Sequence, residues 1–216
     1  MIFDLSATNK IIAKIIVVII IVLAVAKILI SRLIRNNKGG SNLHKAADQG
    51  DVLEVTKLLS NTDIEIKDQN GRTPLHDAVK KNHLAIVDLL LNHGANVHSK
   101  DNSSVTPLHE VVTHTVAETL ITAGADVNAV DSDGFTPLHY AVGNFPDLIE
   151  ILVKKGADIN ARSNDGDTPL SGYARIGSNV VDQLGKKNNE EYVEKAQQLI
   201  DLGADIEGID LSWMKK

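Results

Sequence analysis

A four-residue motif recurs along the chain at nearly constant spacing. The motif Thr-Pro-Leu-His begins at Thr73, Thr106 and Thr136, and an imperfect copy, Thr-Pro-Leu-Ser, begins at Thr168. The intervals are 33, 30 and 32 residues. Self-similarity at such a period indicates a stack of similar structural units, each of which buries its apolar face only against its neighbours.

Two further patterns recur in phase with this motif. Gly-Ala followed by Asn or Asp ends an apolar run at residues 94–97, 124–127, 156–159 and 203–206. Asn-Gly or Asp-Gly precedes the motif at Asn70, Asp133 and Asp165. These dipeptides accept positive φ and suit tight hairpin turns. One unit is therefore expected to contain the motif, a short helix, a turn, a second helix and a tip.

The motif and its period resemble the ankyrin repeat, which is a β-turn followed by two antiparallel helices. The resemblance implies an all-α solenoid, an array of about five helix-turn-helix units with β-hairpin tips. The units are expected at residues 42–72, 73–105, 106–135, 136–167 and 168–210 of a domain that covers residues 42–216. Aromatic residues make up only 3% of the chain, which suits thin layers filled by aliphatic side chains.

Three units depart from the pattern. The first lacks the motif and is expected to cap the array. The third is three residues shorter before Gly124, so about one helical turn should be missing near residues 112–115, and its tip lacks the turn glycine. The fifth carries about fourteen extra residues before its second helix, expected at residues 192–202, and Trp213 should help to cover the end of the core.

The amino-terminal part of the chain predicts a membrane segment. Residues 11–30 are aliphatic except for Lys14 and Lys27, which lie near the two ends. Twenty helical residues span the hydrocarbon core, and terminal lysines reach the headgroups. We expect a single transmembrane helix or signal anchor over residues 11–34, after a flank of residues 1–10 and before a flexible linker of residues 35–41.

An alternative interpretation of the same segment is a cleaved signal peptide. Ala24-Val25-Ala26 has the pattern of a cleavage site, and the alternative is a secreted ankyrin-repeat effector released after cleavage near Ala26. Apolar residues continue beyond Ala26, which favours the anchor. Lys and Arg residues that follow the segment place the repeats in the cytoplasm, as in a single-pass membrane protein, by the positive-inside rule.

Charge and cysteine usage limit the possible partners. The formal net charge is −6, with +5 over residues 1–40 and −11 over the remainder. An acidic repeat domain is repelled by phosphate backbones, so we expect no nucleic-acid partner. The chain has no cysteine, which excludes disulfides and thiolate metal sites.

No motif of enzyme chemistry is present. The chain lacks a Walker A loop, a dinucleotide-binding Gly-x-Gly-x-x-Gly and a Gly-x-Ser-x-Gly elbow. His76, His109 and His139 lie one unit apart and cannot converge on one metal ion. The family resemblance implies instead that each hydrogen-bonds to its motif Thr and to backbone. We therefore expect no catalytic activity, cofactor, metal or small-molecule substrate.

A partner-binding surface remains. In ankyrin proteins the partner usually lies along the concave face, against the tips and the residue that follows the motif histidine. The resemblance thus implies these candidates for partner binding: Arg72, Asp77, Val105, Glu110, Asp133, Phe135 and Tyr140. Phe135 and Tyr140 are expected as apolar anchors. Asp77, Glu110 and the acids of the tips are expected to form a negative concave strip that suits a basic segment. The predicted function is a membrane-anchored scaffold for an unidentified protein partner.

Overall fold

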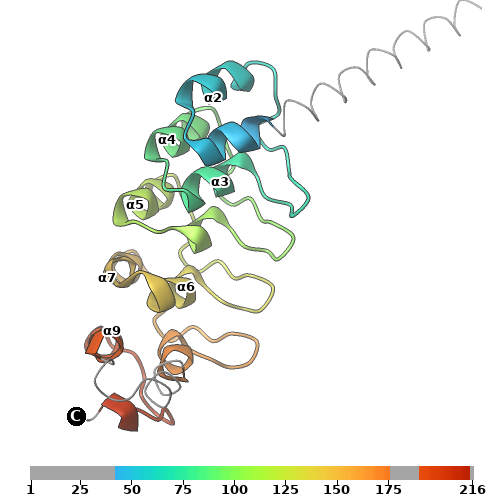
Figure 1. The fold of residues 1–216 in the computed structure, drawn as a ribbon. Coiled ribbons are helices and arrows are strands. Elements are labelled where there is room, and N and C mark those ends of the chain that lie inside the picture. Colours follow the sequence, from blue (N-terminus) through green and yellow to red (C-terminus); the bar gives the residue numbers. More distant parts are fainter. Residues whose placement is uncertain (1–41, 176–189, 215–216) are drawn as a thin grey trace, which may run out of the picture.

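The computed structural model describes residues 42–175 and 190–214, which form a stack of short helices (Figure 1). Residues 42–49 are helical and are followed by α2, Val52–Leu59. The elements that follow are α3 (Pro74–Lys80), α4 (Leu84–Asn92), η1 (Pro107–Glu110), α5 (His114–Thr122), α6 (Pro137–Asn144), α7 (Pro146–Lys154), helical residues 169–175, α9 (Glu190–Asp201) and η3 (Ser212–Met214).

The helices form two layers along the stack. In one layer η1 contacts both α3 and α6, and in the other α4 contacts α2 and α5, which in turn contacts α7. The turns that precede α3, η1 and α6 all project on the same side of the stack (Figure 1). One apolar core runs through every unit, from Leu43 to Trp213. The predicted all-α solenoid is confirmed for the repeat array.

The motif residues explain why each first helix begins where it does. Proline occupies the first turn of α3, η1 and α6, where its fixed φ suits the helix and its missing N–H costs nothing. The motif leucines point into the core and are at most 1% exposed: Leu75, Leu108, Leu138 and Leu170. The motif therefore starts the helix and anchors it to the core at the same time.

The tips are tight turns rather than β-hairpins. No residue in the described ranges belongs to a strand. Each tip is described together with the unit whose motif follows it, so the tip before Thr73 is that of the second unit. In this tip, Asp68 N–H donates to the carbonyl oxygen of Arg72 at 2.9 Å, and Gly71 adopts φ +77°. Neighbouring tips are joined by backbone hydrogen bonds, as between Asn102 N–H and the carbonyl oxygen of Asn70 at 2.9 Å. Each turn is too short for these backbone hydrogen bonds to continue along the chain as a strand.

The third unit is shortened as predicted. Its first helix is only the 3-10 turn η1, and the chain becomes extended at Val111 before α5. The missing tip glycine does not change the turn, because Ser104 adopts φ +62° in its place. Asp101 N–H still donates to the carbonyl oxygen of Val105, at 3.0 Å.

The fifth unit keeps the fold despite its altered motif. Ser171, which replaces the motif histidine, accepts a hydrogen bond from Thr168 N–H at 2.7 Å. Most of the inserted segment lies outside the described residues, and α9 begins two residues before the predicted start of the second helix. Trp213 is only 4% exposed and packs in the core cluster, as predicted for the end of the array.

Candidate functional site

Each motif histidine fastens its own unit to the next one. In the second unit, Nδ1 of His76 accepts a hydrogen bond from Thr73 N–H at 3.1 Å. Nε2 then faces the carbonyl oxygen of Val105, also at 3.1 Å, and must carry the proton because a carbonyl only accepts. His109 and His139 make the same bonds, to the carbonyl oxygens of Phe135 and Asp167.

These three histidines are neutral structural groups. Burial lowers the pKa of His76, and the hydrogen bond to Val105 only partly opposes this effect. Burial likewise lowers the pKa of His109 and of His139. A neutral ring with one donor and one acceptor matches the bonds observed, so the histidines hold the scaffold and leave binding to other residues.

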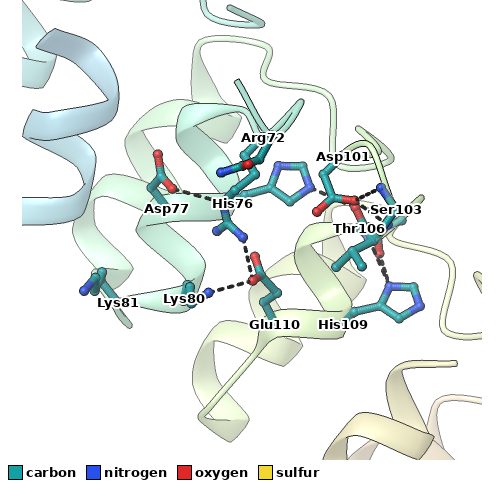
Figure 2. Close-up of polar contacts among 12 residues, drawn as sticks. Arg72, His76, Asp77, Lys80, Lys81, Asp101, Ser103, Thr106, His109 and Glu110 are labelled. Carbon is teal, nitrogen blue, oxygen red and sulfur yellow. Dashed lines mark hydrogen bonds and ion pairs between the residues drawn. The ribbon is translucent and has the colours of Figure 1, made fainter. Parts of the chain in front are cut away.

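A chain of charged side chains links the first three units beside the tips. Arg72 donates through Nε to Asp77 Oδ1 at 3.3 Å and through Nη1 to Glu110 Oε1 at 2.7 Å. Lys80 Nζ lies 3.4 Å from the same oxygen of Glu110. On the other side, His44 pairs with Asp77. Figure 2 shows Arg72 between the two carboxylates. Its guanidinium thus bridges the second and third units.

This network is buried but incompletely satisfied. The side chains of Arg72, Asp77 and Glu110 are only 11%, 17% and 13% exposed. Arg72 Nη2 and Glu110 Oε2 are buried without any hydrogen-bond partner, and they are the only such side-chain atoms in the described part of the chain. An orphaned buried polar group costs about 1–3 kcal/mol. Stability alone therefore does not explain the arrangement.

A polar groove of about 560 Å³ opens over this network. It runs across the first three units, between the tips and the first helices. Its lining residues are Asp48, Asp68, Asn70, Arg72, Asp77, Lys80, Lys81, Asp101, Asn102 and Ser103. Nearly all carry charges or amides, which suits a polar or charged polypeptide better than an apolar ligand.

The structure brings three of the predicted residues together here and separates the others. Arg72 and Asp77 line the groove, and Glu110 pairs with Arg72. The expectation that Asp77 and Glu110 present free negative charge does not hold, because both are paired with Arg72. Val105 is 9% exposed, and its carbonyl oxygen faces His76.

The remaining three candidates lie in the fourth unit and its tip. Asp133 is exposed, and its backbone oxygen accepts a hydrogen bond from Asn164 N–H at 2.9 Å. Phe135 is half-buried with its ring 5.3 Å from that of His139. Tyr140 donates to Asp131 at 2.8 Å, and burial with this bond raises the pKa of its hydroxyl. Contact of these residues with a partner stays a prediction.

Sequence reasoning missed His44 and Lys80, and it included Asp68 and Asp101 only among the tip acids of a negative strip. A signal for the two aspartates was available, because Asp recurs at the start of three tips, at Asp68, Asp101 and Asp131. No local signal marked His44, whose partner lies 33 residues away. The predicted anchor over residues 11–34 and the cleavage site at Ala26 lie outside the described residues. Within the described ranges, no helix has the length and apolar character needed to cross a membrane.

Comparison with known proteins agrees with this architecture. A family model described as ankyrin repeats in three copies matches residues 21–101, 43–131 and 108–209. The chain belongs to the ankyrin-repeat family. Ankyrin repeats are protein-interaction modules, and the array described above is therefore a scaffold for protein–protein interaction.

Curated relatives share the ankyrin repeats over short stretches. The chain is 44% identical over 69 residues to a mouse (Mus musculus) 2-5A-dependent ribonuclease, covering 31% of this chain and 9% of the relative. It is 36% identical over 76 residues to ankyrin repeat domain-containing protein 13C of Danio rerio, covering 35% and 16%. It is 37% identical over 73 residues to the human transient receptor potential cation channel subfamily A member 1, covering 32% and 6%. The chain thus spans less than a fifth of these relatives, so the similarity concerns the repeats alone.

Proposed function

We propose that this ankyrin-repeat chain is a membrane-anchored scaffold that holds a protein partner close to a membrane surface. The observation that carries the proposal is the polar groove over Arg72, together with the two orphaned buried atoms beside it. Natural proteins retain few unsatisfied buried groups, and those retained call for a functional reason. A partner that binds here supplies that reason.

The array suits this role because the groove is built on fixed elements. Asp77 and Lys80 lie on α3, Glu110 on η1, and Asp68 and Asp101 in tips tied together by backbone hydrogen bonds. A surface held in its binding geometry loses little conformational freedom when the partner binds. The half-buried rings of Phe135 and Tyr140 extend the same side of the array and add apolar contact area.

The membrane part of the proposal is supported by the sequence. Residues 11–34 are long and apolar enough to cross a bilayer, and basic residues follow them. The short linker of residues 35–41 then keeps the groove near the membrane, with the repeats on the cytoplasmic side. The cleavage-site pattern at Ala26 supports a second candidate, a secreted ankyrin-repeat effector.

Intact mass and fractionation test the anchor. The anchored form predicts a full-length chain that stays in the membrane pellet after carbonate washing. A released chain that begins at Lys27 would instead establish the secreted form. Any one molecule is either full-length or cleaved. The relative amounts of the two forms therefore decide between the anchored and the secreted protein.

Site-specific photocrosslinking tests the groove. A photoreactive amino acid at Asn70 or Ser103, both exposed in the tips, should capture a partner protein in the producing cell. Matched positions on the opposite layer are Asp88 of α4 and Glu118 of α5, which are also exposed. Equal capture from both faces, or none from the tips, would refute partner binding in the groove.

A further inference from the structure

The four tips share one turn geometry. In the second unit, Asp68 Oδ1 accepts hydrogen bonds from the backbone N–H groups of Asn70 and Arg72 at 2.9 and 2.8 Å. Asp101 does the same in the third unit and Asp131 in the fourth. In the fifth unit this position is Ser163, whose hydroxyl accepts one such bond. Each aspartate is thus fixed through one oxygen, and its second oxygen is left for another donor.

Among donors in the described residues, a second one is present for Asp131 alone. Tyr140 O–H donates to Asp131 Oδ2 at 2.8 Å, across nine residues of the same unit. The position of Tyr140 is taken by Asp77 in the second unit and by Glu110 in the third, and both turn toward Arg72 instead. Consequently no described residue donates to the second oxygen of Asp68 or Asp101. Figure 2 shows Asp101 beside the ring of His76, with one carboxylate oxygen bonded to Ser103.

The charges of the groove pair off and leave these same two aspartates. Lys81 pairs with Asp48 at 3.3 Å. Lys80 lies 3.4 Å from Glu110, and Arg72 joins Glu110 to Asp77. Every cation that lines the groove is therefore engaged, whereas Asp68 and Asp101 take part in no ion pair between described residues. The two acids of the groove without an ion-pair partner therefore lie in adjacent units. The cation of His44 pairs with Asp77 and acts on Asp68 only from a greater distance.

We infer that the groove takes an extended basic segment of the partner protein, with one cationic side chain on Asp68 and a second on Asp101. The inference rests on the proposed function, because it names the chemistry of the partner that the groove holds. The hydrogen bond from Tyr140 to Asp131 shows that a long side chain can reach the second oxygen of a tip aspartate from the groove side. A Lys or Arg makes the same hydrogen bond and also neutralises the charge.

The stack sets the spacing of the two cations. Packed helices of neighbouring units lie about 8–10 Å apart. A polyproline II segment rises about 3.1 Å per residue with three residues per turn, so side chains three residues apart point the same way at about 9 Å. The partner's two basic residues therefore lie at positions i and i+3. Both aspartates are held by their turns before binding, which favours recognition at this spacing.

Two peptides of equal composition provide the probe. Acetyl-Pro-Arg-Pro-Pro-Arg-Pro-amide places its arginines three residues apart, and acetyl-Pro-Arg-Arg-Pro-Pro-Pro-amide places them side by side. Binding to the full-length chain in detergent is measured by isothermal titration calorimetry at low salt. The first peptide should bind about tenfold more tightly than the second, and its affinity should fall as salt rises.

Isosteric variants then assign the contact. Asp68→Asn and Asp101→Asn keep the oxygen that accepts the turn hydrogen bonds, so the tips should stay folded. Each should weaken binding of the first peptide by about tenfold, since hydrogen bonds to charged groups are stronger than neutral ones. Asp131→Asn, whose oxygen is already covered by Tyr140, and Asp88→Asn on α4 should change binding by less than about twofold.

The outcomes separate this inference from the proposal on which it rests. Loss of binding in Asp131→Asn equal to that in Asp101→Asn would overturn it, as would equal affinity for both peptides or no binding of either. If crosslinking at Asn70 and Ser103 still captured a partner in those cases, the groove would bind a segment of different chemistry. Absence of tip crosslinks would instead remove the proposed function itself.

Discussion

In the first unit, Nδ1 of His44 lies 2.5 Å from a carboxylate oxygen of Asp77 in the second unit. Nε2 of the same ring lies 3.0 Å from the carbonyl oxygen of Ile66. Carboxylate and carbonyl oxygens both accept hydrogen bonds, so both ring nitrogens must carry protons. His44 is therefore a cation that joins the capping unit to the network at the groove, unlike the neutral motif histidines.

The first prediction concerns this pair. Burial lowers the pKa of His44, but the hydrogen bond and the charge of Asp77 outweigh it and raise the pKa above 6.5. The stabilisation is thus complete below pH 6.5 and is lost as pH rises through the folded-state value. His44→Gln should cost about 1–3 kcal/mol at pH 6 and clearly less at pH 9. Urea unfolding at both pH values checks this, and an equal loss at the two would contradict it.

The motif histidines predict the opposite pH dependence. Burial lowers the pKa of His76, His109 and His139, so the unfolded chain binds more protons below about pH 6.5. Unfolding free energy should fall as pH drops from 7 to 5. Three motif histidines act in this direction, and His44 acts against them. The fall in unfolding free energy should therefore be steeper in His44→Gln. His98→Gln, at an exposed site, is the matched control. An unfolding free energy that rises as pH drops from 7 to 5 would contradict this prediction.

The packing of neighbouring tips predicts an effect at Gly71. A Cβ added there would lie 2.3 Å from Asn102 Oδ1 and 2.8 Å from its backbone nitrogen, and φ is +77°. Gly94 has φ +88° but nothing within 4 Å of such a Cβ. Gly94→Ala should therefore cost only the left-handed strain, about 1–2 kcal/mol, and Gly71→Ala should cost about 1 kcal/mol or more beyond that. Thermal unfolding of the two variants measures the difference, and equal losses would show that the tips separate freely.

Removal of the Tyr140 hydroxyl tests the tip in which both carboxylate oxygens of Asp131 accept hydrogen bonds. Tyr140→Phe leaves Asp131 Oδ2 without its donor at a residue that is 8% exposed. The variant should lose about 1–3 kcal/mol of stability. Phe135→Leu, which removes the ring contact with His139 but no hydrogen bond, provides a comparison in denaturant unfolding. A stability of Tyr140→Phe equal to that of the parent would mean that solvent replaces the donor without cost.

The repeat architecture could be predicted because its signals are local and periodic. The motif that starts at Thr73 contains the first-turn proline, the buried leucine and the histidine that accepts from the threonine. All of these act within four residues. The shortened third unit was visible as a deletion in the same pattern. Asn-Gly and Asp-Gly predict β-hairpin tips because they suit such turns, but the two backbone hydrogen bonds within each tip span only five residues and leave no strand in the described ranges.

The groove chemistry could not be read from the sequence. Arg72 meets Glu110 across 38 residues and His44 meets Asp77 across 33, so no local pattern marked either pair. Asp77 and Glu110 therefore looked like free acids and were assigned to a negative strip. Nothing in the sequence distinguishes Asp68 and Asp101 from the other tip acids, although these two lack an ion-pair partner among the described residues.

The period of the motif by itself determined that this chain is a stack of similar units, because each unit buries its leucine only against a neighbour. The resemblance to ankyrin repeats implied that each unit is a pair of helices. The period also determined which residues stand at equivalent positions in successive units. Tertiary structure alone decided which equivalent carboxylates are neutralised. Stacking brings side chains about one repeat apart in sequence into contact, and an ion pair depends on which charge the neighbouring unit presents.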